Sequence, residues 1–131
     1  MISLKHGSIG LRLLPLILVM VSCVSTLYIP EHLSPAELIQ KAQEASDRNK
    51  YKQALQYYEA IIERYPSYID EVCAAEYEIA FIHYKQRQYE LAKSEFQALL
   101  SRYDSPDAEL LPLQFKKLTE IVLAKIAAKE H

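Results

Sequence analysis

The chain has 131 residues, with 15 Lys and Arg against 17 Asp and Glu, a size that allows one domain and excludes a large two-domain enzyme. Its two glycines are Gly7 and Gly10, so the 109 residues from Cys23 onward contain none. Glycine builds the phosphate loops of nucleotide-binding folds and the tight turns of β-hairpins. The composition therefore disfavours both classes and leaves an all-α fold.

Residues 1–22 have the pattern of a secretory signal peptide. Lys5 and Arg12 accompany the apolar run Leu13 to Val21, which is shorter than the roughly 20 residues that a membrane-spanning helix needs. The run ends in Met20-Val21-Ser22-Cys23, which resembles the lipobox of bacterial lipoproteins. In that family the cysteine becomes the new N-terminus and is acylated, so the resemblance implies a lipid anchor on Cys23. Two alternatives stay open: ordinary cleavage between residues 22 and 25, and a short uncleaved anchor.

Removal of the signal peptide changes the charge of the chain. Without Lys5 and Arg12, 13 basic residues remain against 17 acidic ones, a net charge of −4, and no block of Lys or Arg is left. We therefore expect no nucleic-acid binding, and membrane attachment through lipid instead of a basic patch. Residues 23–33 show no periodicity and are expected to form the lipidated tether. Cys73 then has no disulfide partner and is expected to be a small buried apolar residue.

Local signals divide residues 34–131 into helices. Ser34-Pro35-Ala36-Glu37 has the N-cap, first-turn proline and capping box of a helix start, and this helix is expected to end near Arg48, where Asn49 tolerates the left-handed conformation. Further helices are predicted over about 51–65, 70–86, 89–103 and 107–130. In the last one, Pro112 marks either a kink or the true first turn.

The predicted last helix carries two apolar sides. One is the stripe of Phe115, Leu118, Val122 and Ile126, expected to cover the preceding helices. The other side is left for a partner and consists of Leu110, Leu113, Ile121, Ala124 and Ala128.

An internal repeat indicates how these helices are arranged. The segment from Lys50 to Tyr65 recurs 38 residues later, from Gln88 to Tyr103. Helix pairs at this spacing resemble the tetratricopeptide (TPR) repeat, whose period is about 34 residues. The resemblance implies an all-α, TPR-like α-solenoid of two helix-turn-helix repeats, about 35–66 and 70–104, with a C-terminal capping helix over about 107–130. Its small and aromatic packing positions fall on Ala42, Ala54, Tyr58, Ala80, Ala92 and Phe96, while Asn49 and Arg87 replace the inter-helix glycine.

No arrangement of side chains in the sequence predicts catalysis. The histidines beyond the signal peptide, His32, His83 and His131, lack metal-ligand spacing, and Cys73 lies ten residues from His83, too far for a nucleophile–base pair on one helix. The carboxylate pairs Glu76/Glu78 and Glu59/Glu63 are expected on solvated helix faces. We therefore expect no enzyme, no cofactor and no metal.

The TPR resemblance also implies a partner-binding groove on the first helices of the repeats. It places Ile39, Gln43, Ser46, Tyr77, Phe81 and Tyr84 in the groove, with Lys85 and Asp47 at its edges. The aromatic stripe can hold a segment of another protein, or the last helix can cover it with Phe115 and Leu118. We expect cover for Phe81 and exposure for Tyr77 or Tyr84.

The lipobox, the short tether and the ending Arg64-Tyr65-Pro66 together resemble a short BamD-type lipoprotein of the outer-membrane β-barrel assembly machinery. This resemblance implies a scaffold on the periplasmic face of the outer membrane that binds an integral β-barrel assembly protein. Val24, in place of the aspartate that retains lipoproteins in the inner membrane, favours the outer membrane. The alternatives are a TPR lipoprotein of a secretion, pilus or peptidoglycan-associated complex, or a small periplasmic chaperone. Oligomerisation through the C-terminal helix is also left open.

Overall fold

A computed structural model of the chain describes residues 27–129. No strand occurs among these residues, which confirms the all-α prediction, and none of their helices is long and apolar enough to cross a membrane. The helices are α1 (Pro35–Asp47), α2 (Tyr51–Arg64), α3 (Ile69–Lys85), α4 (Tyr89–Arg102), the short 3₁₀ helix η1 (Ala108–Leu110) and α5 (Leu113–Ala127).

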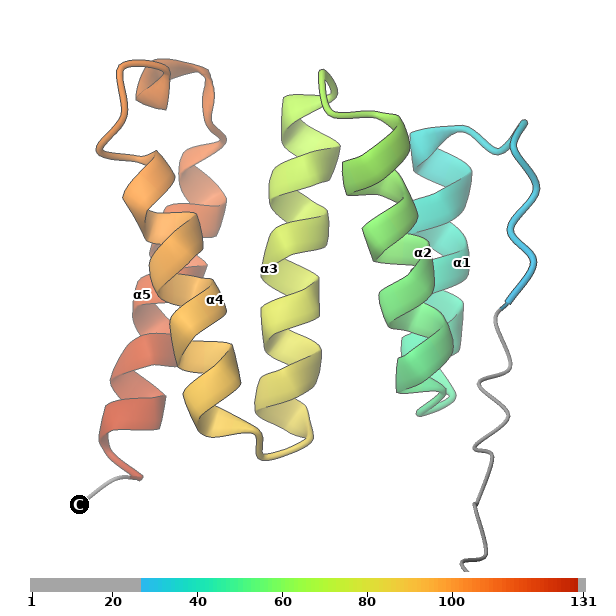
Figure 1. Cartoon of the computed structure of the whole chain (residues 1–131). Coiled ribbons are helices and arrows are strands. Elements are labelled where there is room, and N and C mark those ends of the chain that lie inside the picture. The colour runs from blue at the N-terminus through green and yellow to red at the C-terminus, as the bar shows by residue number, and fades with distance from the viewer. Residues whose placement is uncertain (1–26, 130–131) are drawn as a thin grey trace, which may run out of the picture.

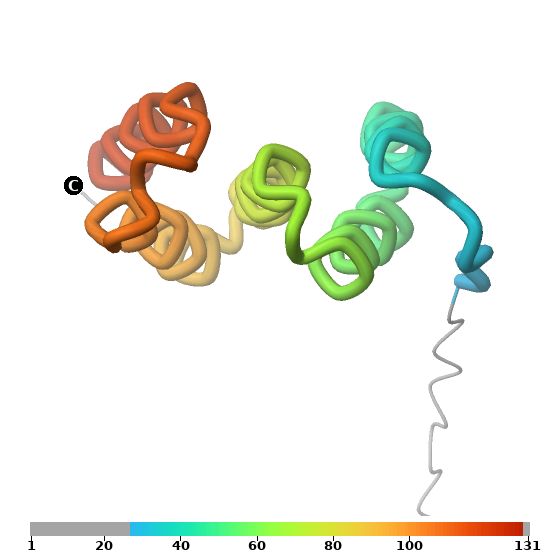
Figure 2. The backbone as a smooth tube through the Cα atoms, turned by 90° about the horizontal axis from the view of Figure 1, so that it is seen from above, coloured from blue at the N-terminus to red at the C-terminus, as the bar shows by residue number. Residues whose placement is uncertain are grey.

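Consecutive α-helices run antiparallel and form two layers (Figures 1 and 2). Seen from above, α1, α3 and α5 make up one layer and α2 and α4 the other, so that the helices follow an arc. We call the side of the arc lined by α1, α3 and α5 the concave face. This alternation is the predicted solenoid of two helix pairs followed by one further helix.

The ends of the first helices of both pairs are set by local chemistry. Ser34 and Glu37 form the predicted capping box, with a 2.9 Å bond from the Ser34 backbone N–H to the Glu37 carboxylate. Asn49 and Arg87 both have positive φ, 57° and 62°. In each case the next residue donates its N–H back to the helix, from Lys50 to the Ala45 carbonyl (2.8 Å) and from Gln88 to the His83 carbonyl (2.9 Å). These bonds are those of a Schellman motif, which usually has glycine at the left-handed position.

Small residues allow the two helices of each pair to pack closely. Ala42 and Ala54 lie in the core cluster of the first pair and Ala80 and Ala92 in that of the second, and all four residues are inaccessible to solvent. The two larger packing residues, Tyr58 and Phe96, are equally buried.

The buried residues form two clusters that meet at α3. Val72, Ala75 and Ile82 join the cluster around α1 and α2, whereas Tyr77 and Ala80 join the cluster around α4 and α5. α3 is therefore covered on two sides, and this links both repeats into one body.

The last helix begins at Leu113, later than the expected start near 107. Leu111 is extended (ψ 136°) and Pro112 occupies the N-cap position, so the proline precedes the helix and does not kink it. This is the effect of a proline ring on the residue before it. The Tyr103 hydroxyl donates to the Pro112 carbonyl at 2.8 Å, and this bond ties the connecting segment to α4.

The buried stripe of α5 also differs from the prediction at one position. Thr119 is fully buried beside Val122 and Ile126, while Leu118 is 41% exposed. With about 3.6 residues per turn, position 119 lies in line with 115, 122 and 126, whereas position 118 lies at the edge of that stripe.

The expected tether is bound to the helices over its second half. Arg64 donates to the backbone carbonyls of Ile29 (3.1 Å) and Pro30 (2.9 Å), and the Tyr65 hydroxyl donates to that of Leu33 (2.6 Å). The Leu33 side chain is buried in the first cluster. Residues 27–33 are thus part of the folded body, and Cys23 lies outside the described residues.

The left-handed conformation of Arg87 predicts that a glycine stabilises the protein. A left-handed backbone costs a non-glycine residue roughly 1–2 kcal/mol, and glycine avoids most of this cost. We expect Arg87→Gly to raise the free energy of unfolding by about 1 kcal/mol in urea titrations. Arg87→Ala, which keeps the Cβ atom, is the matched control and should give no gain; equal stabilisation by both variants would contradict the backbone explanation.

Candidate protein-binding face

The predicted groove residues of α1 lie on the side of this helix that faces α3. Ser46 is buried, Ile39 is half-buried and packs against the first core cluster, and Gln43 is exposed. Asp47 is exposed at the end of the helix. This edge of the concave face therefore offers one amide, one carboxylate and part of an apolar side chain to solvent.

The predicted aromatic stripe of α3 is present, but Tyr77 belongs to the core. Its side chain is only 7% exposed, and its ring lies 5.6 Å from that of Phe96 on α4 and 5.8 Å from that of Phe115 on α5. The expectation of exposure therefore fails for Tyr77, because two later helices close over it. Replacement of Tyr77 by alanine would remove core packing and is unsuitable as a test of binding.

Phe81 and Tyr84 remain half-buried. Their rings are 5.8 Å apart and stacked, and Phe81 also stacks on Tyr77 at 5.8 Å. Leu118 is 41% exposed at the edge of the α5 stripe, whereas the Phe115 ring of α5 lies against the Tyr77 end of the aromatic stripe. Phe81 thus keeps some accessible surface, although the sequence favoured its complete cover.

Lys85 joins the end of α3 to the first repeat. Its Nζ atom donates to the Ser46 hydroxyl at 3.0 Å and lies 5.1 Å and 5.4 Å from the ring centres of Tyr51 and Phe81. Both rings attract the ammonium group. The interactions fix this positive charge at one end of the concave face.

Glu78 is a polar residue of this face that the sequence analysis placed on a solvated helix face and not in the groove. It precedes Lys85 by two helical turns, and it is half-buried, without a hydrogen bond or ion pair to the described residues. Burial raises the pKa of the Glu78 carboxyl, and the charge of Lys85 offsets this in part. Glu76, in contrast, forms an ion pair with Arg102 of α4. The expectation that Glu76 and Glu78 are both simply solvated is therefore wrong, because neighbouring helices contact one and half-bury the other.

Several other titratable groups among residues 27–129 are buried or paired with a neighbouring helix. Burial raises the pKa of the Cys73 thiol, which favours the unreactive protonated form. His83 bonds through Nδ1 to Glu95 of α4 at 2.7 Å. Within residues 27–129 no group of three His, Cys, Asp or Glu side chains is placed to hold a metal ion. Tyr58 has a buried hydroxyl without a partner, and burial together with the charge of Glu78 raises its pKa.

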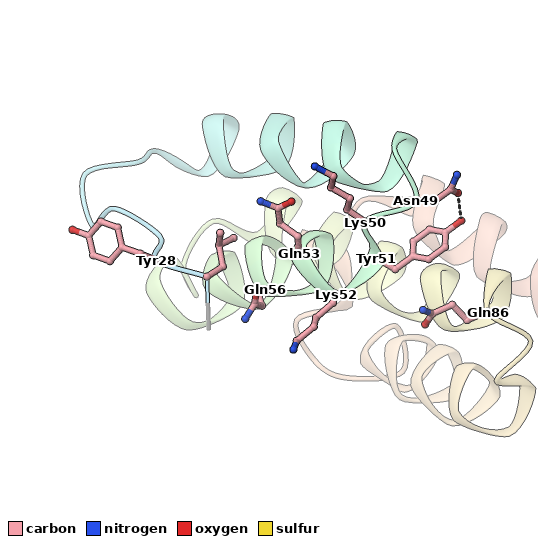
Figure 3. Close-up of a pocket in the computed structure, with 9 residues that line it drawn as sticks. Tyr28, Asn49, Lys50, Tyr51, Lys52, Gln53, Gln56 and Gln86 are labelled. Atoms are coloured by element: carbon pink, nitrogen blue, oxygen red, sulfur yellow. Dashed lines mark hydrogen bonds between the residues drawn. The ribbon is translucent and has the colours of Figure 1, made fainter. Parts of the chain in front are cut away.

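A separate open cavity of about 640 Å³ lies between the segment before α1 and the first turns of α2 (Figure 3). Asn49 and Tyr51 at its edge are joined by a 2.8 Å hydrogen bond. Its lining contains none of the predicted groove residues, so the cavity and the concave face are distinct features. The lining residues are Leu27, Tyr28, Asn49, Lys50, Tyr51, Lys52, Gln53, Gln56 and Gln86.

Comparison with known proteins agrees with this geometry. The family model of the tetratricopeptide repeat matches residues 38–68 and 74–105, which coincide closely with the pairs α1–α2 and α3–α4. An uncharacterized protein of Treponema pallidum (strain Nichols) is 33% identical over 98 residues, which are 75% of this chain and 39% of that protein. The chain therefore spans well under half of this relative. No solved structure matches the sequence. Residues 38–105 thus contain two tandem tetratricopeptide repeats, and with α5 they form an all-helical, TPR-like solenoid.

Proposed function

We propose that this protein is a lipid-anchored scaffold that binds another protein through its concave face. The observation that carries the proposal is the pair of stacked TPR repeats, because helical repeats of this kind build extended concave surfaces for protein partners.

The chemistry of the concave face supports such a role. Glu78 holds a half-buried carboxylate without an ion-pair partner, although Lys85 lies on the same side of α3 and is bonded to Ser46. A half-buried charge of this kind costs stability unless a partner supplies a cation or N–H donors. Beside it, Phe81 offers an aromatic edge. In a partner segment that carries a basic residue next to an apolar one, the basic residue would pair with the Glu78 carboxylate and the apolar one would pack on the Phe81 ring.

The finer part of the proposal concerns the place of action. We infer that Cys23 carries lipid, that the helices face the periplasm at the outer membrane, and that the partner is an integral protein of β-barrel assembly, as for a BamD-like accessory subunit. The supporting features are the lipobox-like residues 20–23, the ending Arg64-Tyr65-Pro66 and the TPR repeats. The alternatives are a scaffold of another cell-envelope complex and a small periplasmic chaperone.

Partner identity is tested by mild crosslinking of membranes, solubilisation in detergent and purification of the native protein. We expect one integral barrel-assembly protein to copurify at close to equimolar amounts. Recovery with pilus, secretion or cell-wall proteins would support the first alternative and contradict the assembly role. A weak and varied set of exported chains would support the chaperone instead.

The lipid anchor is tested by metabolic labelling with radioactive palmitate. We expect Cys23→Ser to abolish the label and to move the protein from the membrane fraction to the soluble fraction, because the thiol is the acylation site. Cys73→Ala is the matched control and should keep the label, since this buried thiol is not accessible to lipid transfer. An unlabelled wild-type protein would contradict the anchor.

The role of Glu78 is tested by Glu78→Gln. Because the pKa of Glu78 is raised in the fold, the charged form destabilises the folded state; the variant should therefore melt at a higher temperature than the wild type at pH 7. The carboxyl takes up its proton at a higher pH in the fold than in the unfolded chain, so the difference should shrink as the pH falls. It should vanish below about pH 4, where the carboxyl is protonated in the unfolded chain as well. We also expect the variant to recover less partner in the copurification.

Glu59→Gln is the matched control for this experiment, since Glu59 is an exposed carboxylate on α2. It should change neither the melting temperature nor the yield of partner. Unchanged partner recovery by Glu78→Gln would show that Glu78 does not contact the partner.

A further inference from the structure

One side of α5 is apolar and uncovered. Leu113 is 73% exposed and Ile121 is 47% exposed, and Ala124 and Ala128 lie on the same side of the helix. Helical repeat proteins normally end in a helix with a polar outer side. The outer side of α5 is instead largely apolar. We call these four residues, together with Lys117 between them, the α5 outer face.

The α5 outer face repeats the pattern with which α3 packs on α4, except that Lys117 stands at the position of the buried Cys73. Ile121, Ala124 and Ala128 follow Tyr77, Ala80 and Tyr84 by the same 44 positions. The same shift relates the buried Ala75 and Ile82 of α3 to the buried Thr119 and Ile126 of α5. α5 therefore corresponds to the first helix of a third repeat.

In α3 this side is covered by the following helix. Tyr77 lies 5.6 Å from Phe96 of α4, and Tyr84 lies 5.7 Å from Tyr89 at the start of α4, as measured between ring centres. Among the described residues, no helix takes the place of α4 against α5 (Figures 1 and 2). The two alanines would allow a helix to approach closely, whereas they offer little apolar area for insertion into lipid.

The charges that border the α5 outer face define what such a helix would carry. Glu76 of α3 forms its ion pair with Arg102 of α4, and Glu120 stands at the corresponding position of α5. Lys117 lies within the face and Lys125 at its other edge. The complementary helix would therefore present a basic residue to Glu120 and acidic residues to the two lysines. Two copies of α5 paired antiparallel would instead bring their lysine-bearing edges together, which disfavours self-association.

We propose that the α5 outer face is a second docking surface, which binds an amphipathic helix of a partner protein in the position that α4 holds against α3. This surface is separate from the concave face and does not depend on the role proposed for Glu78 or on the lipid anchor. Binding of the helix completes a third repeat.

The chain itself contains a suitable probe, because α4 is an amphipathic helix that buries Ala92, Phe96 and Leu99. Its charged residues are Glu90, Lys93, Glu95 and Arg102. A copy of residues 86–104 fused directly after Lys129 would enter in the register in which α4 follows Lys85. We expect this fusion to melt at least about 4 °C above the unfused protein, since additional packing of about 1 kcal/mol shifts the midpoint by this amount. Ile121→Asp in the fusion should abolish this increase in melting temperature. Glu120→Arg in the fusion should also abolish it, and the increase should return when the appended copy carries Arg102→Glu.

Leu91→Asp is the matched control, because Leu91 is 45% exposed on α4, outside the α5 outer face. This substitution in the original α4 should leave unchanged the increase in melting temperature that the fused helix causes. A fusion that melts no higher than the unfused chain would overturn the proposal.

Two measurements on the unfused full chain test the other occupants. If sedimentation shows a dimer that Ile121→Asp converts to a monomer, the α5 outer face binds a second copy of the chain and not a partner helix. If a Cys23→Ser chain floats with vesicles of anionic phospholipid and Ile121→Asp abolishes the flotation, the α5 outer face binds a membrane surface and not a partner helix. We expect a monomer that does not float.

Discussion

The structure depends on the burial of α3 from two opposite sides. One side packs into the core of the first repeat and the other into the core that α4 and α5 complete, so that within residues 27–129 α3 is the helix that belongs to both cores. Between these two sides, a strip of the helix remains accessible on the concave face. The residues that reach solvent there are half-buried and chemically mixed, and they are Ala74, Glu78 and Phe81, followed by the exposed Lys85. The same constraint that stabilises the solenoid thus determines which part of α3 a partner can contact.

Much of this architecture could be predicted because the signals are local. Prolines, the capping box of Ser34 and the spacing of apolar residues define the helices without reference to the rest of the chain. The repeat of 38 positions then gives the order of helix pairs, since equivalent residues must pack in equivalent ways. Asn49 and Arg87 show the strength of this rule, because both adopt the left-handed conformation although neither is glycine.

The features that escaped prediction are tertiary. Tyr77 and Phe81 occupy neighbouring places on one helix side, and only the position of Phe115 decides that Tyr77 is sealed. The raised pKa of Glu78 likewise depends on its burial in the fold, which no local pattern indicates. The binding of residues 27–33 depends on Arg64 and Tyr65, more than 30 positions away. A segment without periodicity carries no local sign of such contacts.

The three hydrogen bonds from Arg64 and Tyr65 to the backbone before α1 have a mechanical consequence. Tension on the N-terminal segment is passed to the end of α2, so that α1 lies outside the path of the load. With lipid on Cys23, as we propose, only residues 24–28 separate the bilayer from this attachment. An extended chain covers at most about 3.5 Å per residue, which would keep the first repeat within roughly 20 Å of the membrane surface. The short linker would then limit how far the solenoid can move from the bilayer, and a partner would have to bind it close to the lipid headgroups.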